Sequence, residues 1–331
     1  MGGKIMINLG IIGFGGISKS LHIPAIRKSK KFQIKAVADV FPDNGTAEKL
    51  GIPKYYTDYK ELLADKDIDA VLISSPHDCH EEHCVAAFNA KKHVIIEKPI
   101  ARNLAEAKNI IDAANKAGTI GMIGFGERFF PEHVYIKNLI KENKFGKLLS
   151  ARIDHYQNFR PPLTSWWRDG EKAGGGAVIG SGVHRLDLLR WFLGEPVSVY
   201  AQAVKMPERL SAEACAHAVI TFDSGVIANF SINWAIYDYI YCEGFTLSGE
   251  KGMIMTAPEM KLGLSEIDNG VMKNFKAPAC KSMYETFAEC IENNVQPESS
   301  LSEGYNSLKL VRAIYKSIET NSVINPDTIT F

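Results

Sequence analysis

The chain has 331 residues, with 46% apolar and 23% charged residues. That length predicts two domains at about 150 residues each, and the composition supplies each with a core. Lys plus Arg and Asp plus Glu both number 38, so the zero net charge excludes the basic surface of nucleic-acid or membrane-surface binders.

The chain carries no membrane or export signal. No apolar run approaches the roughly 18 residues of a membrane span, and Met1–Met6 lack the apolar core of a signal peptide. Six cysteines without framework spacing are typical of reduced thiols. We therefore expect a cytoplasmic protein with no nucleic-acid or membrane partner.

A glycine turn follows the first predicted strand, Ile7–Ile12. It has the pattern G-x-G-x-x-S, written out as Gly13-Phe14-Gly15-Gly16-Ile17-Ser18. Gly13 suits a tight turn, and Gly15 lets the backbone approach a pyrophosphate. A helix that begins near Ile17 would direct N–H groups at phosphates, and Pro24 predicts a kink or break in it. Alone, this glycine pattern is a weak signal.

Asp39 strengthens the interpretation. It lies near the end of the second predicted strand, Phe32–Val40, 24 residues after Gly15. A carboxylate there can accept both hydroxyls of a ribose. The following residues, through Asp43, include no Arg or Lys to hold a 2′-phosphate. The pattern therefore favours NAD over NADP, although Asp39 could also be a turn former.

Strands and helices alternate as far as Gly124. Further strands are predicted over 68–75, 94–96 and 119–124, and helices over 79–90 and 104–117. Alternation at this spacing predicts a parallel, doubly wound α/β sheet, and therefore a Rossmann dinucleotide-binding domain over residues 1–124.

The pattern then changes, and residues 125–331 are predicted to form a second domain. Strands are predicted over 147–158, 197–205, 215–222, 226–234, 243–248 and 252–255, and helices over 131–142, 183–192, 281–293 and 302–320. Successive strands followed by helices predict an α+β domain on a mostly antiparallel sheet. One face of such a sheet is often left for a partner subunit.

The predicted strand Val94–Ile96 ends in Glu97-Lys98-Pro99. Charged groups at the end of a buried strand are costly unless they are paired or used. Ligands of open α/β sheets bind beyond the carboxyl ends of the strands, which makes Lys98 the first candidate catalytic residue. The alternative is a structural ion pair at the surface.

Two other segments are ambiguous. The first, residues 77–84, would place His80, His83 and Cys84 on one helix face, as in a metal site. Its spacing is not H-E-x-x-H, so we predict no metal and a loop, Ser75-Pro76-His77, that faces the cofactor.

The second segment begins with Gly174–Gly176, which is either a flexible hinge or a backbone placed close to a ligand. His184 follows at the start of an apolar helix. It is either a core or capping residue, or a partner in proton transfer with a lysine.

These residues together resemble the glucose–fructose oxidoreductase / inositol dehydrogenase (Gfo/Idh/MocA) family over essentially the whole chain. The resemblance rests on Gly13-x-Gly15-x-x-Ser18, Asp39, Ser75-Pro76-His77-x-x-His80, Glu97-Lys98-Pro99, Arg128-Phe129, Trp167-Arg168, Gly174–Gly176 and Gly182-x-His184-x-x-Asp187. It implies an open-faced sheet domain that forms homodimers or homotetramers. It also implies oxidation or reduction of a sugar or cyclitol hydroxyl with NAD(H) or NADP(H), with Lys98 and His184 in proton transfer.

Two departures from the family pattern stand out. Gly180 occupies a position where the family usually has Asp, and His77 replaces a common Asn near the nicotinamide. The expected cofactor contacts are Gly13, Phe14, Gly15, Gly16, Ile17, Asp39, Ser75, Pro76, His77, His80, Glu97 and Lys98. The expected substrate contacts are Arg128, Tyr156, Trp167, Arg168 and Asp187.

The leading hypothesis is an NAD-dependent dehydrogenase or reductase of a sugar, sugar derivative or cyclitol. Lys98 would bind the reacting hydroxyl and relay its proton, its pKa lowered by burial beside the cofactor. Transient oxidation, as in NAD-dependent glycosidases or isomerases, is a second hypothesis. A non-catalytic NAD(P)-binding regulator is a third, which Gly180 keeps open.

Overall fold

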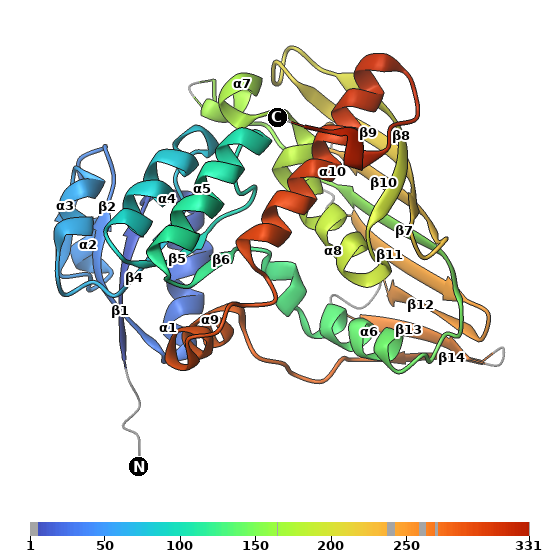
Figure 1. Ribbon diagram of the computed structural model, residues 1–331, viewed down its shortest axis with the longest axis horizontal. Coiled ribbons are helices and arrows are strands. Elements are labelled where there is room, and N and C mark those ends of the chain that lie inside the picture. The colour runs from blue at the N-terminus through green and yellow to red at the C-terminus, as the bar shows by residue number, and fades with distance from the viewer. Residues whose placement is uncertain (1–5, 164, 237–241, 258–262, 269–270, 331) are drawn as a thin grey trace. The chain divides into compact units, whose positions relative to one another are not determined.

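The computed structural model describes residues 6–163, 165–236, 242–257, 263–268 and 271–330 (Figure 1). The expectation that the N-terminus carries no signal peptide rests mainly on residues 1–5, which lie outside the described residues. Contacts between Cα atoms divide the chain into two compact units. The first comprises residues 1–124 and 281–305, and the second comprises residues 125–280 and 306–331.

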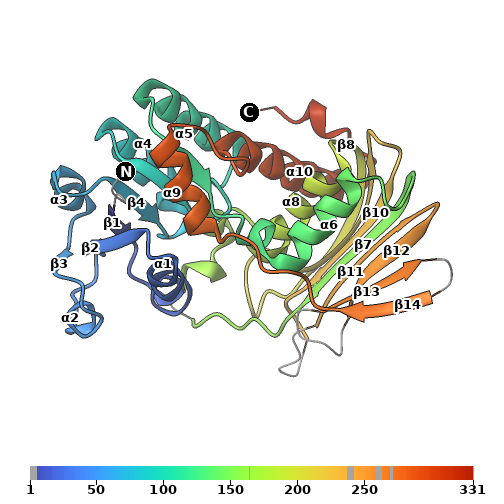
Figure 2. The same cartoon turned by 90° about the horizontal axis from the view of Figure 1, so that it is seen from below.

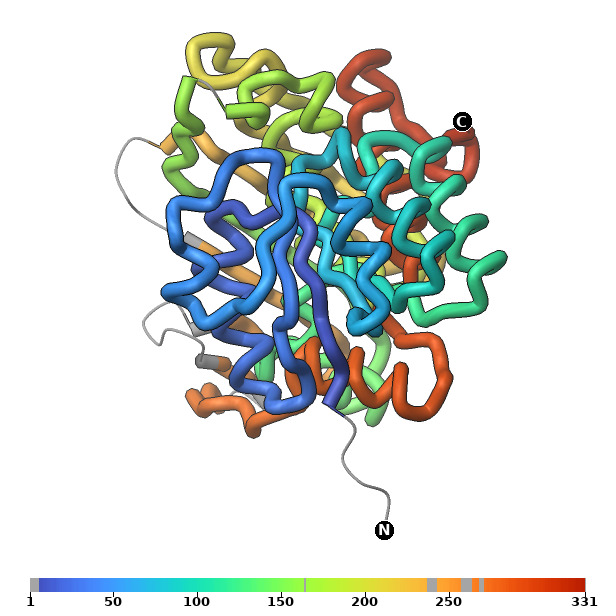
Figure 3. Tube along the Cα trace, turned by 90° about the vertical axis from the view of Figure 1, so that its left-hand side faces the viewer, coloured from blue at the N-terminus to red at the C-terminus, as the bar shows by residue number. Residues whose placement is uncertain are grey.

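The first unit is built on a six-stranded parallel sheet in the order β3-β2-β1-β4-β5-β6. The strands are β1 (Ile7–Ile12), β2 (Phe32–Ala38), β3 (Lys54–Tyr56), β4 (Ala70–Ile73), β5 (His93–Ile96) and β6 (Gly121–Ile123). The blue-to-green part of the trace in Figure 3 is the part of this unit that precedes residue 125. The strand order reverses between β1 and β4, so ligands are expected at the carboxyl ends of these strands. The predicted doubly wound sheet is confirmed.

Local sequence explains where the helices of this unit begin and end. The helices are α1 (Ile23–Ser29), α2 (Thr46–Lys49), α3 (Tyr59–Ala64), α4 (His80–Asn89) and α5 (Leu104–Ala117). Asn103 caps α5 by accepting a hydrogen bond from the Glu106 N–H at 3.0 Å, and Gly118 ends it with a φ of 67°. At Pro24 the helix is irregular but not broken. A π-helical turn, Ser18–His22, leads directly into α1 with helical φ and ψ at His22 and Ile23, and Pro24 lies in the first turn of α1.

Residues 281–305 belong by contacts to the first unit, although the sequence grouped them with 125–331. Helix α9 (Met283–Asn293) lies beside α1 (Figure 1). Its Tyr284 and Phe287 rings lie 6.3 and 6.0 Å from the Phe32 ring of β2. Ser299 O accepts from Ile123 N at 3.0 Å. These apolar and backbone contacts account for the difference in grouping.

The second unit contains an eight-stranded sheet in the order β14-β13-β12-β11-β7-β10-β9-β8. Its strands are β7 (Leu148–Tyr156), β8 (Pro196–Lys205), β9 (Glu213–Phe222), β10 (Ile227–Asn233), β11 (Cys242–Gly249), β12 (Gly252–Ala257), β13 (Gly263–Asp268) and β14 (Val271–Phe275). Only β7 and β10 pair in parallel, so the sheet is mostly antiparallel, as predicted.

Helices cover one face of this sheet, as Figure 2 shows for α6 (Pro131–Lys141), α8 (Val183–Leu193) and α10 (Leu301–Thr320). A short helix, α7 (Gly170–Ala173), precedes the glycine run. In the described parts of the chain, no helix is long and apolar enough to cross a membrane.

Candidate functional site

The glycine turn between β1 and α1 has one tightly packed glycine and two open ones. Gly13 has a φ of 95°, and a Cβ there would lie 2.6 Å from Ser75 N, so only glycine fits. Around Gly15 and Gly16 no described atom lies within 4 Å of an added Cβ. The backbone is therefore open for a ligand at these two residues, as a pyrophosphate requires.

Ser18 does more than keep the helix close to the strand. Its Oγ donates to Gly13 O at 2.5 Å and lies 2.7 Å from Ser74 Oγ. The hydroxyl is fully buried, so it fixes the glycine turn against the end of β4.

Asp39 is held next to this turn. Its Oδ2 accepts from the Phe14 N–H at 2.7 Å, and its Oδ1 accepts from the Phe41 N–H at 3.1 Å. An ionised carboxylate can accept about four hydrogen bonds, so capacity remains for ribose hydroxyls. The open glycines and this oriented carboxylate fit a dinucleotide.

The segment after β4 links two loops of the first unit through His80. The imidazole is fully buried, with Nε2 3.0 Å from Ser75 O and Nδ1 2.9 Å from Pro99 O. Burial lowers the pKa of His80 although both carbonyls oppose that shift. The neighbouring His77 is also buried, with its ring 5.5 Å from that of His80.

The rest of the histidine-rich segment takes part in hydrogen bonds. His83 Nδ1 lies 2.9 Å from Ser75 Oγ, and burial lowers the pKa of His83 to about 4. Within the described ranges, no group of three or more His, Cys, Asp or Glu side chains is arranged to hold a metal ion.

Lys98 lies two residues beyond the end of β5 and is half-buried. The preceding Glu97 has its Oε1 3.0 Å from His22 Nε2, and its Oε2 accepts from the Lys98 N–H at 3.1 Å. The Glu97 side chain is only 14% exposed, so it is not a surface carboxylate. The Lys98–Pro99 peptide bond is cis.

In the second unit, two glycines of the run are closely packed. A Cβ at Gly175 would lie 2.1 Å from Tyr315 Oη, and one at Gly176 would lie 2.0 Å from Glu213 O. Close packing against these residues therefore requires glycine at both positions, a reason that the sequence did not indicate.

Glu213 and Tyr315 support the helical stretch that carries His184. The Glu213 carboxylate accepts from Gly176 N at 3.1 Å, Val178 N at 2.9 Å and Tyr315 Oη at 2.9 Å. Burial raises the pKa of Glu213, and these donors oppose that shift. Neither residue is predicted from the sequence, where a lone glutamate in the apolar pattern of β9 is the available signal. His184 is half-buried in the first turn of α8, and its ring lies 6.3 Å from that of Phe125.

The space beside Gly180 is filled by aromatic rings. A Cβ there would lie 2.2 Å from Trp234 Cη2 and 3.0 Å from Trp167 Cζ3. Trp234 is 2% exposed, and its Nε1 donates to Ser181 Oγ at 3.0 Å. Indole rings therefore occupy the position at which the family resemblance predicts a carboxylate.

Two predicted substrate contacts are bound to each other. The Arg128 guanidinium donates to both Asp187 oxygens at 2.7 Å, and Ser307 Oγ donates to Asp187 at 2.9 Å. Both charged side chains are almost fully buried. Burial raises the pKa of Asp187, and Arg128 opposes the shift. This geometry favours support of α8 over contact with a substrate.

The other predicted substrate contacts are half-buried. Tyr156 Oη lies 2.8 Å from Ser231 Oγ. Trp167 stacks on Trp166 at 4.2 Å between centroids. Arg168 donates to Glu208 O at 2.7 Å.

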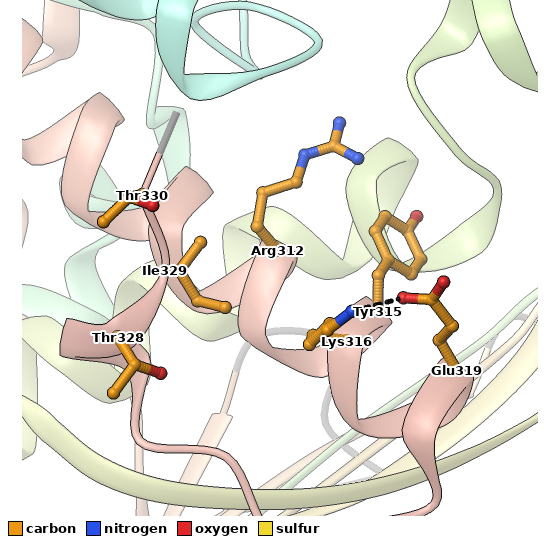
Figure 4. A pocket seen from close by; sticks show the side chains of 7 residues that line it. All are labelled: Arg312, Tyr315, Lys316, Glu319, Thr328, Ile329 and Thr330. Atoms are coloured by element: carbon orange, nitrogen blue, oxygen red, sulfur yellow. Dashed lines mark hydrogen bonds and ion pairs between the residues drawn. The ribbon is translucent and has the colours of Figure 1, made fainter.

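A cavity of about 530 Å³ lies between α10 and the C-terminal residues (Figure 4). Its lining contains none of the predicted site residues. Arg312, which lines it, donates to Gly174 O at 2.9 Å. With Tyr315, which also lines it, Arg312 supports the glycine run from this side.

The first unit brings together the predicted cofactor contacts in a connected set. The glycine turn touches the end of β4 and Asp39, and His80 joins Ser75 to Pro99. The second unit holds Arg128, Tyr156, Trp167, Arg168, His184 and Asp187.

A parallel sheet with an open glycine turn and an oriented strand-end carboxylate defines a dinucleotide-binding protein of the Rossmann class. Two family models match the chain. Residues 7–125 match the oxidoreductase family with an NAD-binding Rossmann fold, and residues 133–255 match the GFO/IDH/MocA C-terminal domain. The chain belongs to the Gfo/Idh/MocA family of oxidoreductases.

Similar proteins include enzymes of sugar and cyclitol chemistry. The chain is 28% identical to 1,5-anhydro-D-fructose reductase of Ensifer adhaerens, over 96% of this chain and 98% of the relative. It is 31% identical to myo-inositol 2-dehydrogenase of Thermotoga maritima, over 75% and 74%. A levoglucosan dehydrogenase in complex with NADH and levoglucosan has the same fold, with a TM-score of 0.89, 23% identity, and 97% and 99% of the chains covered.

Proposed function

We propose that the chain is an NAD-dependent oxidoreductase that transfers a hydride between nicotinamide and a hydroxyl-bearing carbon of a sugar, sugar derivative or cyclitol. The observation that carries the proposal is the half-buried Lys98 two residues beyond β5, in a unit whose glycine turn and Asp39 fit a dinucleotide. The names of the similar proteins support the substrate class. When bound, the nicotinamide supplies the hydride acceptor or donor.

The chain's own residues bind the cofactor, orient the reacting hydroxyl and move its proton. Lys98 Nζ hydrogen-bonds the reacting hydroxyl and relays its proton, and His184 acts as a general acid or base. The open backbone at Gly15 and Gly16 binds phosphates, and Asp39 accepts from the ribose hydroxyls.

Asp39 also supports the choice of NAD over NADP. A 2′-phosphate would approach a carboxylate that two backbone N–H groups hold in place, and like charges repel. Asp39→Ala should weaken NAD binding more than NADP binding in a fluorescence titration. The opposite order would contradict this assignment. The test is needed because relatives differ in their cofactor, as the name of the NADP-dependent D-xylose 1-dehydrogenase of Haloferax volcanii indicates.

The uncovered face of the eight-stranded sheet supports a homodimer or homotetramer. Apolar side chains that the strand register places on one face are exposed, namely Tyr200 (38%), Val219 (47%) and Ile227 (49%). Analytical ultracentrifugation of Val219→Lys against the wild type tests this, and a monomeric wild type would contradict it. We also place the chain in the cytoplasm, which is supported by the thiols of the described cysteines.

The test of the activity is a panel of polyols, cyclitols and sugars with NAD, followed by NADH absorbance, for the wild type and Lys98→Ala. Turnover by the wild type and its loss in the variant are expected. Equal activity of the variant would contradict the role of Lys98.

Two alternative outcomes would point elsewhere. Product formation with retained NAD and no net NADH would indicate transient oxidation, as in a glycosidase or isomerase. Tight NAD binding without turnover would indicate a regulator. Gly180 keeps the regulator open as an alternative, because indole rings stand where the family pattern has a carboxylate.

A further inference from the structure

A buried chain of polar side chains runs through the first unit from α9 to the residue before Lys98. Tyr284 Oη lies 2.6 Å from His22 Nδ1, and His22 Nε2 lies 3.0 Å from Glu97 Oε1. Tyr284 and His22 are 2% and 1% exposed. The three residues come from α9, the π-helical turn before α1, and the end of β5.

The positions of the protons on these three side chains follow from the protonation of Tyr284. Burial and the nearby Glu97 charge raise the pKa of Tyr284 well above its usual value, so the phenol keeps its proton. It can therefore donate to His22 Nδ1, and the hydrogen bond at one ring nitrogen determines the tautomer. The remaining ring proton then lies on Nε2, which is 3.0 Å from Glu97 Oε1 but outside hydrogen-bond alignment, so this link is a close electrostatic contact.

At the other end of this series of side chains, Glu97 reaches the backbone of Lys98. Glu97 uses its second oxygen to accept from the Lys98 N–H at 3.1 Å. Gly124 packs against the same carboxylate, because a Cβ at Gly124 would lie 3.4 Å from Glu97 Oε1. Glu97 is thus held on one side by His22 and joined on the other to the residue that carries the amine.

We propose that His22 and Tyr284 are positioning residues for Lys98: Tyr284 fixes the tautomer of His22, the Nε2–H dipole of His22 stabilises and orients the Glu97 carboxylate, and Glu97 holds the Lys98 backbone. The inference rests on the proposed function of Lys98. Neither residue belongs to the glycine turn pattern or to the Glu-Lys-Pro motif, and Tyr284 comes from a helix 186 residues further along the chain than Lys98.

The experiment measures the reactivity of the Lys98 amine, so it does not require a substrate that turns over. Competitive acetylation of the full-length protein, read by mass spectrometry across pH, gives the pH at which the Lys98 amine becomes reactive. In His22→Leu the Glu97 carboxylate loses the N–H dipole that stabilises it, so its charge acts more strongly on its surroundings, and an anion nearby favours the ammonium form of Lys98. The reactivity midpoint should therefore move upward, by roughly half a unit or more.

Two further variants test the individual links. Tyr284→Phe removes only the hydroxyl and should give a smaller upward shift than His22→Leu. His22→Gln keeps an N–H donor toward Glu97 and should restore most of the wild-type midpoint. With a substrate from the panel, His22→Leu should lower kcat by about 10- to 100-fold, as expected for a misplaced catalytic group, with a smaller change in KM.

Phe287→Leu is the matched structural control. Phe287 lies on the same helix as Tyr284, is fully buried and stacks on Phe32. Its replacement should lower Tm without moving the Lys98 midpoint. The inference is overturned if His22→Leu and Tyr284→Phe leave the midpoint where Phe287→Leu leaves it. If instead no substrate turns over, or Lys98→Ala is fully active, the proposed function fails while the acetylation midpoints still decide this inference.

Discussion

Replacement of Gly180 by alanine should destabilise the second unit, because the space for a side chain is already filled. The added Cβ would lie 2.2 Å from Trp234 Cη2 and 2.6 Å from Cζ2. The indole has little room to move, since it contacts the Phe159 ring at 4.4 Å and donates to Ser181.

The expected cost follows from three terms. Overpacking a buried site costs about 1–3 kcal/mol, and loss of the indole hydrogen bond costs about 1 kcal/mol. Alanine is better than glycine in a helix by about 1 kcal/mol, which offsets part of the cost. The net destabilisation is about 1–3 kcal/mol, and Tm should fall by about 2–4 °C per kcal/mol for a domain of this size.

Thermal and urea unfolding would measure the effect, with Gly126→Ala as the matched control. Gly126 lies in the same unit, and no described atom is within 4 Å of its added Cβ. Trp234→Phe removes the clashing ring atoms, so the double variant Gly180→Ala/Trp234→Phe should be more stable than the sum of the single changes predicts.

Two results would refute this reasoning. In the first, Gly180→Ala unfolds at the same temperature as Gly126→Ala. In the second, Trp234→Phe shows no coupling to Gly180→Ala. Gly180→Asp, which restores the carboxylate of the family pattern, should be worse than alanine, because an unpaired charge would be buried against indoles. A stable and more active aspartate variant would equally contradict the steric explanation.

Three more predictions concern the remaining buried groups. Arg128→Met should cost about 3–5 kcal/mol by leaving Asp187 buried without its partner; an unchanged Tm with a raised substrate KM would instead indicate a substrate contact. Burial lowers the pKa of His133 from 6.5 to about 4, so the unfolded chain binds the proton more tightly and stability falls as pH drops from about 6.5 to 4. His133→Gln should flatten that slope in urea unfolding, and an unchanged slope would refute it. Glu213→Gln should cost about 1–3 kcal/mol through weaker bonds to Val178, measured by urea unfolding against wild type; no loss would show that the charge is unimportant there.

The sequence predicted those parts of the fold that depend on local pattern. The run Ile7–Ile12 with its glycine turn, the cap at Asn103 and the stop at Gly118 are each determined by neighbouring residues. Strand β14 was missed because its side chains are mostly exposed and give no apolar alternation.

The supports of the candidate site could not be predicted for a different reason. The partners of the glycine run lie far away in the sequence, since Tyr315 is 139 residues from Gly176. The indole beside Gly180 is likewise contributed by Trp234, which follows β10 and lies 54 residues later. A sequence shows that a glycine is present, but the atom that makes it necessary is known only once distant segments have packed.

The return of residues 281–305 to the first unit has a consequence for the order of folding during synthesis. Domains generally fold as units, N-terminal first, as the chain emerges at about 5–20 residues per second. Here the face of Phe32 and the backbone of β6 receive their partners only when α9 and Ser299 have been made. The dinucleotide-binding unit therefore waits roughly ten to forty seconds at those rates, incomplete, while nearly all of the second unit is translated. A fragment ending at Gly124 would retain the whole glycine turn and Glu97, but His22 would lack Tyr284.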